Sequence, residues 1–408
     1  MAQPALLRAE VDNYQDIGNT TVGPAYWALA KESFPDAEYV VQVPLATTDV
    51  NETVAWTEAA VNSVGWDRIQ AIELGNEPNF YHAGFGFDIG SYSGVEVGKE
   101  AYILDVETCF KLGIDRANRL KTVAHHYYQN DAGGADKLAQ GLMDVAATHA
   151  HLDLFKARRI DWLRQNQPDI PFVLSEVGNS LDATHSYPYQ ARLGSALWQV
   201  DFCLYAMSLG VAHVHYQQIM HAGYNLWLPV ASAGMSAQVF ANFYSQPFVA
   251  DFMGKQSPAD NKKKTTMQKL DIGKSDDTRP NLAAYAAFED GVLKRIAVAN
   301  LEYWSKTSST HARARPTVER RGLPAGTKEI RVDVLGSPEG AGAGAESITY
   351  AGCQWTFASG GRRSRMCGGT AAPCRSRTGP RAWLYGIARR CCCRFVLERL
   401  AESGRGDG

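Results

Sequence analysis

The stretch Ile72-Glu73-Leu74-Gly75-Asn76-Glu77-Pro78 joins a short apolar run to an acidic side chain at its end. A second stretch, Pro171-Phe172-Val173-Leu174-Ser175-Glu176, has the same form. Short apolar runs that are bounded by turn residues are typical of buried strands. Each stretch therefore predicts a strand that delivers a glutamate, Glu77 or Glu176, to the carboxyl end of a sheet.

The surrounding sequence alternates between strand-like and helix-like segments over about the first 280 residues. We expect five strands here, near residues 40, 72, 123, 173 and 213. This alternation is typical of a parallel α/β fold. Further on, two apolar runs flank the turn Glu289-Asp290-Gly291, which is a hairpin signature.

These patterns predict a chain of four parts. An α/β catalytic domain is expected over residues 1–253, and a polar, Lys-rich surface linker over 254–280. A small antiparallel β domain is expected over 281–357, followed by an Arg- and Cys-rich tail over 358–408 that stands outside the fold.

The tail differs in composition from the rest of the chain. From Gly361 onward it has eleven Arg, no Lys and three acidic residues, and six of the eight cysteines lie at or after Cys353. Its cysteines lack the paired spacing of a zinc site apart from the contiguous triplet Cys391-Cys392-Cys393. Two interpretations stay open, an altered reading frame or unspliced segment and a disordered basic tail. Neither interpretation assigns a function to the tail.

The overall composition excludes several classes of partner. The chain has 408 residues, of which 45% are hydrophobic and 21% charged, as in ordinary globular proteins. A net charge of −2 gives no electrostatic reason to expect nucleic acid or an anionic membrane as a partner. No apolar run approaches the length of a bilayer span, and Met1-Ala2-Gln3-Pro4 does not begin a signal peptide. The sequence predicts no oligomeric state.

Two glutamates that face one cleft can cleave a glycosidic bond without a metal or cofactor. One protonates the leaving oxygen, and the other attacks the anomeric carbon or activates a water molecule. Carboxyl groups about 5–5.5 Å apart lead to retention of configuration. Each glutamate also has a plainer interpretation, Glu77 as a solvated turn residue and Glu176 as a helix cap.

Several motifs together resemble glycoside hydrolase family 79, the β-glucuronidase and heparanase group of clan A, and especially its fungal members. The motifs are Gly75-Asn76-Glu77-Pro78, His125-His126-Tyr127-Tyr128, Ser175-Glu176 and His221-Ala222-Gly223-Tyr224-Asn225, followed by a β domain. The resemblance covers roughly residues 15–357. It implies a (β/α)8 barrel with a C-terminal β domain, and carbohydrate as the substrate.

The resemblance also implies roles for individual residues. Glu77 would be the acid/base, Glu176 the nucleophile, and Asn76 a hydrogen-bond partner of the sugar 2-hydroxyl. Their substrate would be a terminal β-linked glucuronic acid or its 4-O-methyl ether.

Four more residues are expected to bind substrate. Tyr127 would orient the nucleophile and His125 would line the same face, because residues i and i+2 of a strand point together. Gly223 and Tyr224 would meet the uronate carboxylate. The alternatives are that Tyr127 and His125 fill the core and that Tyr224 forms part of an apolar rim.

The chain departs from the family in the number of its strands. A complete barrel has eight strands in about 250 residues. Only 44 residues separate Glu77 from Lys121, which leaves strand 5 shortened or missing. We therefore expect an incomplete barrel that also lacks strands 1 and 2.

Two alternatives to a β-glucuronidase stay open. The first is an inactive truncated family member or carbohydrate-binding remnant. The second is another clan A glycosidase, such as a xylosidase, an arabinofuranosidase or a glucosylceramidase-like enzyme. Full-length family members are typically secreted, and the sequons at Asn19 and Asn51 agree with that.

Overall fold

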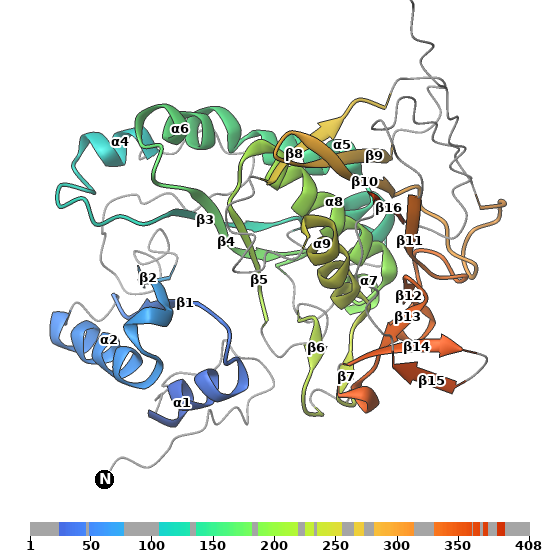
Figure 1. The fold of residues 1–408 in the computed structure, drawn as a ribbon, viewed down its shortest axis with the longest axis horizontal. Coiled ribbons are helices and arrows are strands. Elements are labelled where there is room, and N and C mark those ends of the chain that lie inside the picture. The colour runs from blue at the N-terminus through green and yellow to red at the C-terminus, as the bar shows by residue number, and fades with distance from the viewer. Residues whose placement is uncertain are drawn as a thin grey trace, which may run out of the picture. The chain divides into compact units, whose positions relative to one another are not determined.

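The computed structural model describes residues 24–45, 49–76, 106–130, 136–181, 187–218, 225–231, 235–254, 265–272, 281–313, 330–360, 362–367, 370–373 and 382–387. They belong to two compact units (Figure 1). The first unit lies within residues 1–125 and 161–172, and the second lies within residues 126–160 and 173–408.

The first unit contains a strand–helix–strand element. Strands β1 (Tyr39–Val43) and β2 (Ile69–Leu74) pair in parallel, and α2 (Val50–Val64) connects them. Asp49 caps α2, because its Oδ1 accepts a hydrogen bond from the Asn51 amide at 2.9 Å. A small apolar core fixes the element, and its buried members are Trp27, Val41, Val43, Ala60, Val64 and Ile69.

Short helices make up much of the rest of the described part of this unit. Trp27 comes from α1 (Pro24–Ser33), and a 3₁₀ turn, η2 (Trp66–Arg68), precedes β2. The rings of Phe110 and Trp162 lie 5.3 Å apart and join α4 (Val106–Lys111) to α6 (Trp162–Asn166).

Three strands, ordered β3-β4-β5, form a second sheet, and the boundary between the units passes through β3 (Val123–Tyr128) and β4 (Phe172–Gly178). β5 (His213–Tyr216) runs parallel to β4. Helix α8 (Leu193–Leu209) is buried along most of its length and ends at Gly210 with φ +108°, a left-handed cap that suits glycine. The other helical elements of this part are π-helices η4 (Leu138–Leu142) and η5 (Lys156–Asp161), with α5 (Val145–Asp153), α7 (Tyr187–Gln190), 3₁₀ η6 (Ala241–Tyr244) and α9 (Ser245–Met253).

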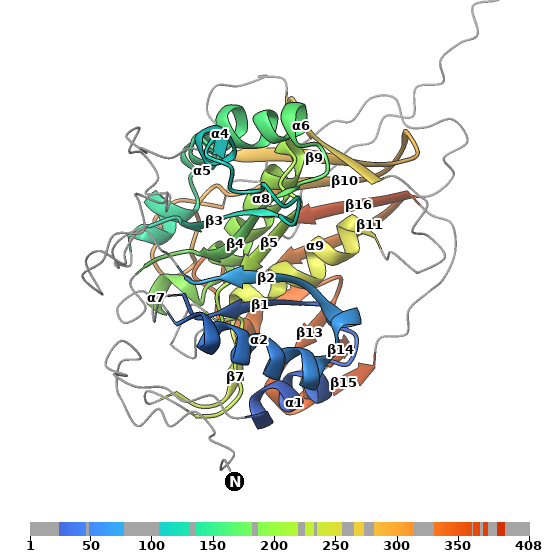
Figure 2. The same ribbon diagram turned by 90° about the vertical axis from the view of Figure 1, so that its left-hand side faces the viewer.

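The second unit also carries a nine-stranded sheet in the order β15-β14-β13-β12-β11-β16-β10-β9-β8. Figure 2 shows β9, β10, β16 and β11 running side by side. Its strands are β8 (Thr265–Leu270), β9 (Leu282–Glu289), β10 (Val292–Asn300), β11 (Ile330–Gly336), β12 (Thr349–Tyr350), β13 (Cys353–Trp355), β14 (Arg363–Cys367), β15 (Thr370–Pro373) and β16 (Ala382–Ile387). Two 3₁₀ turns, η7 (Ala345–Ser347) and η8 (Phe357–Ser359), and a two-stranded ribbon of β6 (Trp227–Leu228) and β7 (Gln238–Val239) complete the unit's described elements.

The predicted hairpin is confirmed. β9 and β10 pair antiparallel around a turn in which Asp290 has φ +51° and Gly291 has φ +79°. Two successive residues with positive φ are the mark of the type I′ turn, whose twist matches that of paired strands.

The sheet does not follow the predicted domain boundaries. β8 lies in the expected linker 254–280 and pairs with β9. β14, β15 and β16 lie in the tail that was expected to stand outside the fold, and β16 is inserted between β10 and β11, parallel to both. Strand pairing uses backbone groups, which every residue except proline supplies in full, so an Arg- and Cys-rich composition does not prevent it. The run Ala382-Trp383-Leu384-Tyr385-Gly386-Ile387 is apolar, as suits a central strand.

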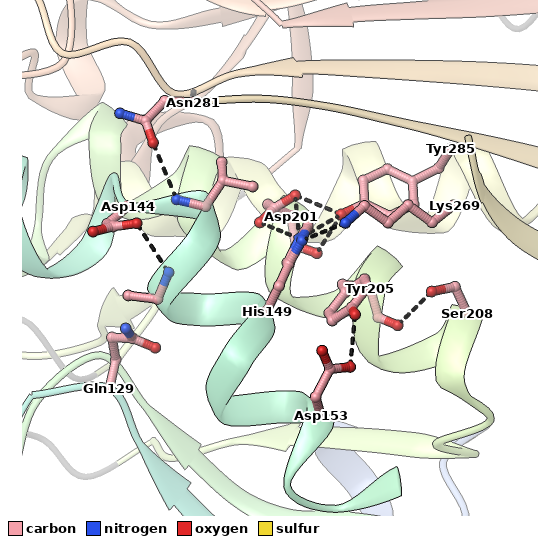
Figure 3. Close-up of polar contacts among 12 residues, drawn as sticks. Gln129, Asp144, His149, Asp153, Asp201, Tyr205, Ser208, Lys269, Asn281 and Tyr285 are labelled. Carbon is pink, nitrogen blue, oxygen red and sulfur yellow. Dashed lines mark hydrogen bonds and ion pairs between the residues drawn. The ribbon is translucent and has the colours of Figure 1, made fainter. Parts of the chain in front are cut away.

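A buried polar cluster joins this sheet to the helices of the second unit (Figure 3). Asp201 on α8 is fully buried and accepts a hydrogen bond of 2.6 Å from the hydroxyl of Tyr285 on β9. His149 on α5 places Nε2 3.2 Å from Asp201 Oδ2, and its Nδ1 lies 2.8 Å from the Lys269 ammonium. An ammonium can only donate, so Nδ1 accepts and Nε2 carries the hydrogen.

The five predicted α/β strands are all present, in one sheet of two strands and one of three. No helix of the described part is both long and apolar enough to cross a bilayer.

Candidate active site

Glu176 lies in the last part of β4 at an irregularity in the strand. Leu174 pairs with Val214 and Val177 pairs with Tyr216, so β4 takes three steps where β5 takes two. This is a bulge, and a bulge re-aims the side chains beside it. Leu174 and Val177 are fully buried, whereas the Glu176 side chain is 21% exposed. The carboxylate is therefore accessible at the end of an otherwise packed strand.

Two side chains of the neighbouring strand hold this carboxylate. The Tyr128 hydroxyl donates a hydrogen bond of 2.5 Å to Glu176 Oε1. His126 Nδ1 lies 3.7 Å from Oε2, and its side chain is 18% exposed. Tyr128 and His126 are two residues apart on β3 and share one face of the strand. Together they orient the carboxylate, and the hydroxyl stabilises its negative charge.

Tyr127 was expected to orient Glu176, but the structure places its side chain on the opposite, packed face of β3. It is 1% exposed, and its hydroxyl donates to Gln129 Oε1 and lies 3.1 Å from His151 Nδ1. The ring packs against Phe155 and Phe202, and burial raises the pKa of the phenol well above its ordinary value. Tyr127 therefore fills the core.

His125 also departs from its expected place. It is 7% exposed and its ring lies 5.3 Å from that of Phe172, so it is packed within the first unit rather than lining a cleft. The reason is strand alternation, because His125 and Tyr127 share the face of β3 that the core covers. Sequence reasoning chose the wrong alternate pair of His125-His126-Tyr127-Tyr128 and so missed His126 and Tyr128.

Asn76 is exposed just beyond β2 in the first unit. Its Oδ1 accepts a hydrogen bond of 3.1 Å from Gln42 Nε2 on β1. The predicted residues Glu77, Gly223 and Tyr224 lie outside the described residues. No group of three or more metal-ligating side chains gathers within the part of the chain that the structure describes.

Parts of the chain are similar to known proteins. Residues 284–379 match the Glycosyl hydrolase family 79 C-terminal beta domain, which reaches from β9 past β15. A beta-glucuronidase of Neurospora crassa is 29% identical over 204 residues, and one of Aspergillus niger is 27% identical over 202 residues. Each alignment covers 48% of this chain but only 35% of the relative.

A solved structure shares the fold. The 4-O-α-L-rhamnosyl-β-D-glucuronidase of Fusarium oxysporum 12S, solved with Rha-GlcA, matches with a TM-score of 0.57 over 85% of this chain and 75% of that chain. At 18% identity the likeness is one of fold. The C-terminal domain match and the two related fungal sequences make the chain similar to members of glycoside hydrolase family 79, and it spans about a third of the length of those two relatives.

Proposed function

We propose that the chain is a retaining glycoside hydrolase that removes terminal β-linked glucuronic acid, or its 4-O-methyl ether, from glycans. The observation that carries this proposal is the accessible Glu176 carboxylate at the end of β4, oriented by Tyr128 and His126. The related proteins of Neurospora crassa and Aspergillus niger are named as beta-glucuronidases, which supports the choice of sugar.

In the proposed first step Glu176 attacks the anomeric carbon and forms a covalent ester with the sugar. Glu77 gives its proton to the leaving oxygen, so that the aglycone departs as an alcohol. In the second step Glu77 takes a proton from water, which attacks the same carbon and releases Glu176 as a carboxylate. The Tyr128 hydroxyl keeps Glu176 Oε1 in place, which leaves Oε2 to act as the attacking atom.

The remaining residues of the proposal concern recognition of the sugar. Asn76 would bind the 2-hydroxyl, and Gly223 and Tyr224 would bind the uronate carboxylate. These roles rest on the motif resemblance. Secretion is likewise a proposal that rests on the family.

The test is turnover of an aryl β-glucuronide by the unmodified chain and by two variants at Glu176. Glu176→Gln should abolish turnover. Added azide should restore turnover to Glu176→Gly, with a glycosyl azide of inverted configuration as the product. Glu339→Gln is the matched control, since Glu339 forms an exposed pair with Lys306 of 3.0 Å. Undiminished turnover in Glu176→Gly would refute the proposed nucleophile. A panel of aryl xylosides, arabinofuranosides and glucosides separates the other clan A activities.

A second candidate function is a carbohydrate-binding remnant without catalysis. The observation in its favour is that the described α/β strands lie in two small sheets, one of two strands and one of three. Such open sheets leave strand edges unpaired, which works against a pre-organised site. A broad, non-cooperative melting transition without glucuronide turnover would favour this candidate.

A further inference from the structure

One face of the three-stranded sheet packs against α8, and side chains of the two outer strands show which face it is. Figure 1 shows the strands β3, β4 and β5 side by side, with β4 in the middle. The Tyr127 ring of β3 lies 5.0 Å from the ring of Phe202 on α8. The Tyr216 hydroxyl of β5 lies 3.3 Å from Cys203 Sγ, also on α8. Tyr127 and Tyr216 therefore both point toward this helix.

The opposite face of the sheet carries the Glu176 carboxylate. Successive residues of a strand point to opposite faces, so Tyr128 points away from α8. Its hydroxyl donates to Glu176 Oε1, which places the carboxylate on the same side. On β5, His215 precedes Tyr216 and likewise points away from α8. Glu176 is thus flanked by Tyr128 on the β3 side and by His215 on the β5 side.

The register between β4 and β5 makes His215 the nearest neighbour of Glu176 on β5. The bulge in β4 leaves Ser175 and Glu176 together opposite His215, the one β5 residue between the paired positions Val214 and Tyr216. Neighbouring strands lie about 4.7–4.9 Å apart. A ligand that touches the Glu176 carboxylate from the open face therefore lies within reach of the His215 imidazole.

The His215 side chain is accessible and has hydrogen-bonding groups to offer. Within the part of the chain that the structure describes, its imidazole makes no hydrogen bond or ion pair, and its ring contact is with His213 at 6.1 Å. Both side chains are exposed. Partial desolvation and, secondarily, the charge of His213 lower the pKa of the His215 imidazole below its ordinary value. A neutral imidazole has one N–H donor and one nitrogen acceptor.

We propose that His215 is a substrate-binding residue that hydrogen-bonds a ring hydroxyl of the sugar whose anomeric carbon Glu176 attacks. The inference rests on the function proposed above and names a further contact of the same site. The β3 side of Glu176 is taken by the side chains that hold its carboxylate, Tyr128 and His126. A pyranose seated over Glu176 therefore finds its side-chain partner of the sheet on β5. A hydroxyl group both donates and accepts, so either imidazole nitrogen can serve it.

The experiment is calorimetric titration of the full-length Glu176→Gln chain, in which turnover is blocked, with methyl β-glucuronide. Adding His215→Ala should weaken binding about 3–10-fold, the effect of one hydrogen bond. His215→Gln, which keeps an N–H donor, should recover most of the affinity. His213→Ala is the matched control, because His213 is exposed on the same face of β5 but lies opposite Val173, and it should leave the affinity unchanged.

A series of methyl β-glucuronides that each lack one ring hydroxyl identifies the contact. The cost of His215→Ala should disappear for the derivative that lacks the contacted hydroxyl and persist for the others. Equal affinities of the His215→Ala and His213→Ala chains for the unmodified sugar would overturn this inference alone. So would a cost of His215→Ala that no derivative abolishes. The absence both of turnover by the unmodified chain and of binding by the Glu176→Gln chain would overturn the proposed function, and this inference with it.

Discussion

Tyr128 and Glu176 are joined across β3 and β4 by a hydrogen bond of 2.5 Å from the phenol to carboxylate Oε1. Hydrogen bonds to a charged acceptor contribute about 1.5–3 kcal/mol, roughly twice the value for neutral pairs. The adjacent Tyr127 makes no such contact and donates within the core instead. The two tyrosines therefore allow the same substitution to be compared on opposite faces of one strand.

Tyr128→Phe should lower kcat on an aryl β-glucuronide about 10–100-fold, because it removes a charged hydrogen bond from the proposed nucleophile. Its effect on stability should be small, since the side chain is only half-buried.

Tyr127→Phe should have the opposite profile. It leaves the buried acceptor Gln129 Oε1 without its donor, so we expect a loss of about 1–3 kcal/mol of unfolding free energy with turnover largely kept. Urea denaturation and steady-state kinetics of the two variants measure both effects. A larger loss of turnover in Tyr127→Phe than in Tyr128→Phe would reverse our assignment of the two faces.

Sequence patterns predicted the local elements well, because those elements depend on local chemistry. The Asp290-Gly291 turn, for example, follows from the conformation of a few residues. The face of β3 could not be predicted in the same way. In His125-His126-Tyr127-Tyr128 both alternating pairs have identical composition, so only tertiary packing decides which pair is buried.

The tail strands were missed for a related reason. β16 pairs with β10 and β11, from which it is separated by many residues, and no local pattern indicates such partners. The bulge at Glu176 likewise exists only as a register between two strands. Long-range pairing was therefore the main part of the fold that the sequence could not predict.

The buried cluster around Asp201 makes a prediction about stability. Asp201→Ala should lower the free energy of unfolding by about 2–5 kcal/mol, since it leaves the Tyr285 hydroxyl and the His149 Nε2 hydrogen without their acceptor. Lys269→Met removes an exposed ammonium from the same cluster and should cost at most about 1 kcal/mol. Equal urea midpoints for the two variants would show that Asp201 does not hold the sheet to α8.

The shifted pKa of His151 predicts that the stability of the folded chain depends on pH. Burial lowers the pKa of its imidazole below the ordinary value, and the charge of Asp144 offsets this only in part. The unfolded chain therefore binds the proton more readily than the folded chain. The contribution of His151 is fully present above about pH 6.5 and is lost as the pH falls through the lowered folded pKa.

The measurement is the urea midpoint between pH 5 and 7.5 for the unmodified chain and for His151→Gln. The variant should lose less stability on acidification. An NMR titration of His151 that gave a pKa at or above about 6.5 would contradict the expectation.

Alanine substitutions at Gly340 and Gly291 distinguish the effect of a steric clash from the effect of backbone strain. Both residues have positive φ, +82° and +79°. Alanine at either position should therefore lower the free energy of unfolding by about 1–2 kcal/mol, the cost of a left-handed backbone conformation. A Cβ at Gly291 would meet nothing within 4 Å, whereas a Cβ at Gly340 would lie 2.2 Å from the Trp304 carbonyl oxygen. That oxygen belongs to the backbone and accepts a hydrogen bond from the Ala341 amide, so it cannot move aside without breaking this bond.

Gly291→Ala should therefore cost only the conformational penalty. Gly340→Ala should cost more, because the added methyl group displaces the Trp304 backbone. Thermal melts of both variants test this pair. If the two alanines cost the same, the segment around Trp304 yields to the added methyl group, and the hydrogen bond between the Ala341 amide and the Trp304 carbonyl does not hold it in place.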